Sequence, residues 1–108
     1  PHTIDVQRRG LYMLELTPVN YRTEVELSRD PILICVHDSE SHPPEGLEQL
    51  CGRELKCYGL DGQRYEEMAK SLRVLTLPSA IVLDKGSVVQ RIHGERSVGD
   101  FARILDLN

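Results

Sequence analysis

The stretch from Val74 to Gly94, VLTLPSAIVLDKGSVVQRIHG, decides the fold of this chain. It contains one proline, Pro78, followed by two runs of strand-forming residues, Ser79 to Leu83 and Ser87 to Ile92. Asp84-Lys85-Gly86 separates these runs, and Gly86 can take a positive φ without steric cost. Because a proline cannot donate a hydrogen bond to a strand ladder, Pro78 marks the start of a strand or a special turn. The stretch therefore predicts a β-hairpin directly after Pro78.

The bulk composition indicates one globular domain over residues 1–108. Hydrophobic residues make up 40% and charged residues 28% of the chain, which is unlike a disordered protein. The net charge of −4 is opposite in sign to the basic surface that phosphate binding needs, so we expect no nucleic-acid partner. The longest apolar run, Ile32 to Val36, is far shorter than a membrane span, and no signal peptide is visible, so we expect no membrane partner.

The cysteines favour a reducing compartment. Cys35, Cys51 and Cys57 are an odd number and form no Cys-x-x-Cys, so we expect no disulfide framework and predict a cytoplasmic location. Cys35 and Cys57 fall on strands predicted to be central, where a buried thiol has a raised pKa and is inert. Cys51 lies near the end of a predicted helix and is the most reachable of the three.

The rest of the chain alternates strands and helices. Ile32 to Val36 is apolar without alternation, as in a strand buried on both faces. Thr17 is the expected N-cap of a helix whose inward residues are Tyr21, Val25 and Leu27. Residues 1–10 are expected to form an arm. Strands are expected at Leu11 to Leu16, Ile32 to Val36 and Glu54 to Leu60. Two helices are expected at Pro18 to Ser28 and at Pro44 to Cys51. A third helix is expected around the apolar stripe Tyr65, Met68, Ala69 and Leu72, and a fourth after a capping pair at Ser97 and Asp100.

This β-α-β-α-β-α-β-β-α order, with a proline before the hairpin, resembles the thioredoxin-like family. The similar segments are Leu14 to Tyr21, Pro31 to Ile34, Lys85-Gly86 and Gly94. The resemblance implies an α/β thioredoxin-like fold with a central mixed sheet of four to five strands flanked by helices. It also implies that Pro78 is cis and faces the substrate site.

The sequence departs from that family at the active-site loop. The family's Cys-x-x-Cys falls on Ser41-His42-Pro43-Pro44, which has no sulfur. Thiol–disulfide exchange needs a thiolate nucleophile and a second, resolving thiol, and a serine hydroxyl replaces neither. The family's buried acid falls on Cys35 and its tryptophan on His37, and the second helix is shortened. We therefore carry over the fold and not the dithiol chemistry.

The resemblance leaves a binding groove as the candidate site. In the family, an extended peptide pairs with the backbone beside the cis-proline, and this mode needs no sulfur. We expect Leu77 to be an exposed apolar residue there. Ser41 is expected to cap the short helix, with Pro43 and Pro44 in its first turn, and not to act as a nucleophile. The predicted groove residues are Ser41, His42, Pro43, Leu77, Pro78, His93 and Gly94.

Three functions follow from these residues. The first is a redox-inactive, protein-binding adaptor, accessory or chaperone-like module whose partner is a protein or extended peptide. The alternative is a thiol–disulfide oxidoreductase using a non-standard cysteine, Cys51 or Cys57. The third is a metal-binding module using His37, His42 and His93, but their spacing matches no known zinc motif. We therefore predict no catalytic residue, no metal and no cofactor.

Overall fold

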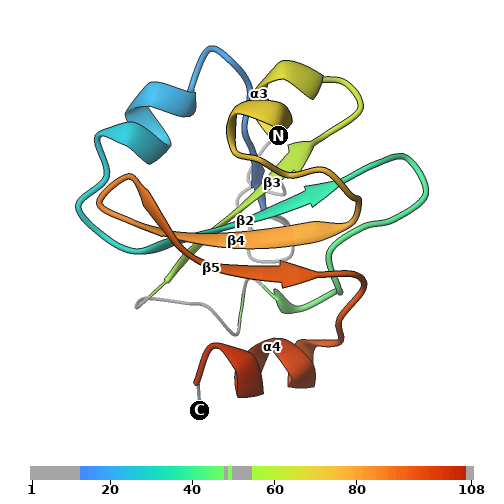
Figure 1. Ribbon diagram of the computed structural model, residues 1–108. Coiled ribbons are helices and arrows are strands. Elements are labelled where there is room, and N and C mark those ends of the chain that lie inside the picture. Colours follow the sequence, from blue (N-terminus) through green and yellow to red (C-terminus); the bar gives the residue numbers. More distant parts are fainter. Residues whose placement is uncertain (1–12, 48, 50–54, 107–108) are drawn as a thin grey trace, which may run out of the picture.

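The structure is a computed structural model that describes residues 13–47, 49 and 55–106 (Figure 1). Its five-stranded sheet has the order β1-β3-β2-β4-β5. β1, β3 and β2 run parallel to one another, whereas β4 is antiparallel to β2 and to β5, so the sheet is mixed as predicted. The predicted arm at residues 1–10 lies outside the described residues. The strands are β1 (Leu14–Glu15), β2 (Ile32–His37), β3 (Lys56–Asp61), β4 (Ser79–Asp84) and β5 (Ser87–His93).

The sheet separates two hydrophobic clusters, and β2 contributes to both. Ile32, Ile34 and Val36 belong to one cluster, and Leu33 and Cys35 belong to the other. All five side chains are buried, because successive residues of a strand point to opposite faces. The uninterrupted apolar run of β2 is thus explained by burial on both faces.

Helices cover both faces of the sheet. The π-helix η2 (Arg22–Glu26) and α3 (Glu66–Ser71) lie on one face, and α4 (Val98–Ile104) lies on the other (Figure 1). The predicted stripe of α3 is confirmed, since Ala69 and Leu72 are buried and Tyr65 and Met68 pack against the same cluster. The predicted capping pair of α4 is also confirmed: the Ser97 hydroxyl accepts from the Asp100 N–H, and the Asp100 carboxylate accepts from the Ser97 N–H.

The first helix is shorter than predicted and differently wound. Thr17 Oγ1 accepts from the Asn20 N–H at 3.4 Å, which agrees with its predicted capping role. The helical segment that follows is a π-helix, in which the Leu27 N–H donates to the Arg22 carbonyl at 2.9 Å. Val25 is buried as predicted, but Leu27 is 61% exposed. That prediction was wrong because Leu27 is only two residues beyond Val25, which places it on the opposite side of a helix.

The hairpin forms at the predicted place. Lys85 and Gly86 both have positive φ, 55° and 84°, as the central residues of a type I′ turn do. A register shift at Val82/Leu83 leaves Val89 as the extra residue of β5, which is an edge strand. The Leu77–Pro78 peptide bond is cis, as the resemblance implied.

The predicted helix from Pro44 to Cys51 lies partly outside the described residues. Leu47 and Gln49 are helical, whereas Pro43 and Pro44 lie before the turn that precedes them. Leu47 is fully buried in the cluster beneath α4. In the described part of the chain, no helix is long and apolar enough to cross a membrane.

Candidate functional site

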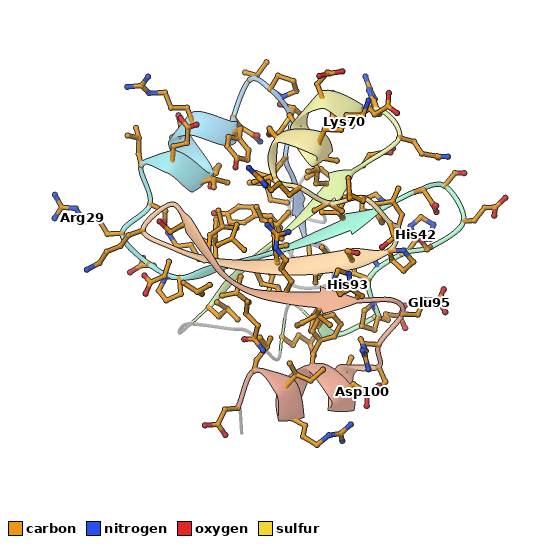
Figure 2. The ribbon with its side chains drawn as sticks, viewed as in Figure 1. Arg29, His42, Lys70, His93, Glu95 and Asp100 are labelled. Carbon is orange, nitrogen blue, oxygen red and sulfur yellow. The ribbon has the colours of Figure 1, made fainter. Side chains whose placement is uncertain are left out.

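A cavity of about 220 Å³ opens beside Pro78, at the C-terminal end of β2. We call it the Pro78 cavity. It lies between the loop after β2, the start of β4 and the N-terminal half of α4. Its lining residues are Cys35, Val36, His37, His42, Pro43, Pro44, Pro78, Ser79, Ala80, Gly94, Glu95, Arg96 and Phe101. In Figure 2, His42, His93 and Glu95 lie at this end of the sheet, and Arg29 lies at the other.

The cavity brings together four of the seven predicted groove residues. His42, Pro43, Pro78 and Gly94 line it. His93 does not: it follows Ile92, which is buried in the cluster beneath α4, so alternation along β5 directs His93 to the other face.

Leu77 is also absent from the cavity lining, and its predicted exposure is wrong. Its side chain is half-buried and packs against the cluster that contains Val36. Gly62 makes room for it, since a Cβ on Gly62 would lie 3.0 Å from Leu77 Cδ2. The exposed leucine of this loop is Leu75, at 87% exposure.

Ser41 does not have its predicted capping role. It is buried, and its hydroxyl donates to Asp38 Oδ1 at 2.8 Å. The Ser41 N–H donates to the same oxygen at 2.9 Å, so the two residues close a tight polar turn after β2. The hydrogen bonds from Ser41, together with that from the Glu40 N–H, lower the pKa of Asp38. Pro43 and Pro44 precede the helical residues, so no first turn begins at Ser41.

A carboxylate from the edge strand reaches the wall of the cavity. Glu15 of β1 lies beside Gly59 of β3, and Gly59 pairs in turn with Cys35 of β2. The missing side chain of Gly59 lets the Glu15 carboxylate extend over β3, because a Cβ there would collide with it. Glu15 Oε1 lies 3.1 Å from His37 Nε2.

This contact sets the charge state of His37. The hydrogen bond to Glu15 raises the pKa of His37, and it outweighs the partial burial of the ring, which lowers it. The carboxylates of Glu15 and Asp61 and the Asp38 carbonyl act in the same direction. The His37 ring also lies beside that of His42, with centroids 5.8 Å apart.

Cys35 supplies a sulfur to the cavity wall, but an inert one. It is a free thiol and only 5% exposed. Burial, reinforced by the Glu15 carboxylate, raises the pKa of Cys35 to about 12. At neutral pH the side chain is therefore a neutral, weakly polar group.

Cys57 differs from its sequence-based prediction. It is half-buried on the same face as Leu55, as expected, but it is disulfide-bonded. It pairs with Leu33 near the start of β2, whereas Cys35 lines the cavity further along the same strand. Two residues of strand, about 7 Å, separate Leu33 from Cys35. Cys51 lies outside the described residues.

The three histidines of the predicted metal site do not form one cluster. His37 and His42 line the cavity, and His93 does not. Within residues 13–47, 49 and 55–106, no group of three or more His, Cys, Asp or Glu side chains is arranged to hold a metal ion.

The backbone just before Pro78 is open. The Pro78 carbonyl accepts from the Gly94 N–H at 2.9 Å, which extends the β4–β5 ladder by one residue. One residue upstream, neither the N–H nor the C=O of Leu77 takes part in a hydrogen bond within the described part of the chain. An unpaired donor and acceptor thus stand directly beside the cavity.

Sequence reasoning missed several of the residues around the cavity. Glu95 and Arg96 follow Gly94 in the loop before α4, and Phe101 faces the cavity from α4 itself. The sequence carries one signal for Phe101, which is the first large apolar residue after the Ser97 capping pair. Nothing in the pattern places Glu95 or Arg96 at a cavity, because that depends on how α4 packs.

The fold is thioredoxin-like, as comparison with known proteins shows. The Trx4 domain of ERdj5 superposes with a TM-score of 0.72 at 16% identity, over 87% of this chain and 92% of that one. The crystal structure of ERdj5 form II gives a TM-score of 0.71, also at 16% identity, over 89% of this chain and 14% of that one. No family model matches the sequence. No curated protein matches it either. At 16% sequence identity, these comparisons show the fold alone.

Proposed function

We propose that this domain is a redox-inactive, protein-binding module, acting as an adaptor, an accessory factor or a chaperone-like unit. Its partner would be an extended peptide segment that pairs with the backbone at Leu77. The observation that carries the proposal is that the N–H and C=O of Leu77, next to the β4–β5 ladder, form no hydrogen bond within the described part of the chain. β-Augmentation pairs a peptide with unpaired backbone groups at a sheet.

The thiol chemistry of the site supports binding without exchange. No sulfur occurs in the loop Ser41 to Pro44. Cys35, which does line the cavity, has its pKa raised to about 12 and so holds almost no thiolate at neutral pH. Among the described residues, the cavity therefore has neither of the groups that disulfide exchange requires, a thiolate nucleophile and a resolving thiol.

Leu75 offers a sharp test. It is 87% exposed and lies two residues before Leu77, whereas Leu27 is 61% exposed on η2. Because both are solvent-exposed leucines, Leu75→Asp and Leu27→Asp should leave stability nearly unchanged. In pull-downs with tagged protein, the Leu75→Asp variant should lose the partners that wild type and Leu27→Asp retain. Equal recovery from all three would count against binding at this edge.

The disulfide at Cys57 favours a second candidate, a thiol–disulfide oxidoreductase using Cys51 or Cys57. Such an activity would use a cysteine other than Cys35, which lines the Pro78 cavity. Insulin reduction in the presence of dithiothreitol separates the two functions. Activity that disappears in a Cys57→Ser variant would support the oxidoreductase and contradict the redox-inactive module, and absence of turnover would do the reverse.

The same cysteine bears on the proposed cytoplasmic location. Disulfides persist mainly in oxidising compartments, so a bonded Cys57 in the cell would contradict this part of the proposal. Rapid alkylation of intact cells, followed by mass spectrometry of Cys57, measures its state directly. Cys57 found reduced in cells would support a cytoplasmic location, and Cys57 found bonded, as it is in the structure, would count against it.

A further inference from the structure

The size of the Pro78 cavity defines what can enter it. A cavity of about 150 Å³ is large enough to hold benzene, and drug-sized ligands occupy pockets of about 300 Å³ or more. At about 220 Å³, the Pro78 cavity lies between these limits. It matches one bulky side chain better than a free cofactor.

The walls of the cavity are mostly apolar. Pro43, Pro44 and Pro78 provide ring faces, and Phe101 provides a phenyl ring. Val36 and Ala80 add aliphatic surface, and the Cys35 thiol is neutral. An aromatic ring entering here would lose contact with water on most of its surface and could pack against Phe101 edge to face.

Basic side chains outnumber acidic ones among the described residues that line the cavity. His37, His42 and Arg96 line it, against one carboxylate, Glu95. Glu15 compensates the charge of His37, but no ion pair to Arg96 or His42 occurs among the described residues. Arg96 is held only through its Nε, which donates to the His93 carbonyl at 3.2 Å, so its terminal nitrogens remain available for a carboxylate.

We propose that the Pro78 cavity takes one aromatic side chain of an extended peptide, and that an acidic residue two positions along the peptide contacts Arg96. This inference rests on the proposed function and specifies its partner. A peptide strand paired at Leu77 points successive side chains to opposite sides, so every second residue faces the cavity. The aromatic residue and the acidic residue two positions away therefore face the same side, on which Arg96 lines the cavity.

Synthetic peptides test whether an aromatic side chain, which we call the anchor, occupies the cavity. Acetylated, amidated hexapeptides of serine and threonine with a central Phe-Thr-Glu segment are compared with matched Ala-Thr-Glu and Phe-Thr-Lys versions by isothermal titration. Replacing Phe by Ala should weaken binding about 30-fold, which corresponds to about 2 kcal/mol for burial of the ring. Replacing Glu by Lys should weaken it about 3- to 10-fold. Equal affinity for all three peptides would overturn the inference.

Amide NMR spectra of the same titrations separate this inference from the proposed function. Shifts at the Leu77 amide report backbone pairing, and shifts at Ala80 and Phe101 report occupancy of the cavity. If Leu77 shifts with every peptide and Ala80 and Phe101 with none, the anchor is wrong and the pairing stands. If no peptide moves Leu77, the proposed function fails as well.

Protein variants test the same contacts from the other side. Arg96→Glu should reverse the preference between the Glu and Lys peptides, and Arg29→Glu, at the far end of the sheet, should leave it unchanged (Figure 2). Ala80→Leu should fill the cavity and abolish the advantage of Phe over Ala. An unchanged preference in a folded Arg96→Glu variant would overturn the acidic flank.

Discussion

At the scale of single residues, the contact between Glu15 and His37 has a measurable consequence. Glu15 raises the pKa of His37 above the ordinary value of about 6.5. Because the folded-state pKa is the higher one, this stabilisation is present below about pH 6.5 and is lost as the pH rises through the folded-state pKa. We expect Glu15→Gln to lower the pKa of His37, and to reduce stability at pH 6 by no more than about 1 kcal/mol, since Glu15 is half-exposed.

Histidine chemical shifts measured against pH, and urea unfolding at pH 6 and pH 8.5, check this prediction. The stability difference between Glu15→Gln and wild type should be smaller at pH 8.5 than at pH 6. Glu26→Gln is the control, because Glu26 is an exposed carboxylate on η2 and makes no contact with His37. A pKa of His37 that does not move in Glu15→Gln would contradict the role assigned to this pair.

A substitution at Gly59 should change the pKa of His37 indirectly, by displacing the Glu15 carboxylate. A Cβ at Gly59 would collide with the Glu15 carboxylate, which is the mobile end of a flexible side chain and can move aside. Gly59→Ala should therefore lower the pKa of His37, as Glu15→Gln does. In the Glu15→Gln background it should lower that pKa no further, and a further fall in the double variant would contradict the mechanism.

At the scale of elements, the hairpin turn carries a suboptimal residue. Lys85 has a φ of 55°, a left-handed conformation that asparagine tolerates better than lysine. Lys85→Asn should raise stability by about 0.5 kcal/mol, or about 2–4 °C in Tm for a domain of this size. The same change at Lys70 on α3 should lower Tm, because asparagine is a poorer helix former. A lower Tm for Lys85→Asn would contradict this account of the turn.

The helices and strands also show how much of the fold could be predicted from the sequence. Hydrophobic periodicity, capping pairs and the proline before the hairpin predicted the sheet, α3, α4 and the turn, because each depends on neighbours along the chain. Leu77 was placed wrongly because its burial depends on Gly62 of another segment. The bridge from Glu15 to His37 could not be predicted, since it requires β3 to lie between β1 and β2 with a glycine at the crossing point.

At the scale of the whole molecule, one face of the sheet holds two different cysteine environments. Cys35 lines the cavity as a buried free thiol, and Cys57 is disulfide-bonded near the start of β2. A binding module needs neither to react. The alternative, an oxidoreductase, needs Cys51 or Cys57 to cycle between thiolate and disulfide. The reactivity of the cysteines in the native protein therefore decides between the two proposed functions.

Thiol titration with a chromogenic disulfide at pH 7.5 makes that comparison. Because its pKa is about 12, Cys35 should react more than about 100-fold more slowly in the native protein than in urea. Cys57 should react only after reduction, and a non-reducing peptide map should find it cross-linked and identify its partner. Cys35→Ser is the control that assigns the slow phase. Fast labelling of native Cys35 would show that the cavity holds a reactive thiolate, and this would contradict a purely binding role. Slow labelling is the result expected if this end of the sheet binds a peptide at Leu77 without thiol chemistry.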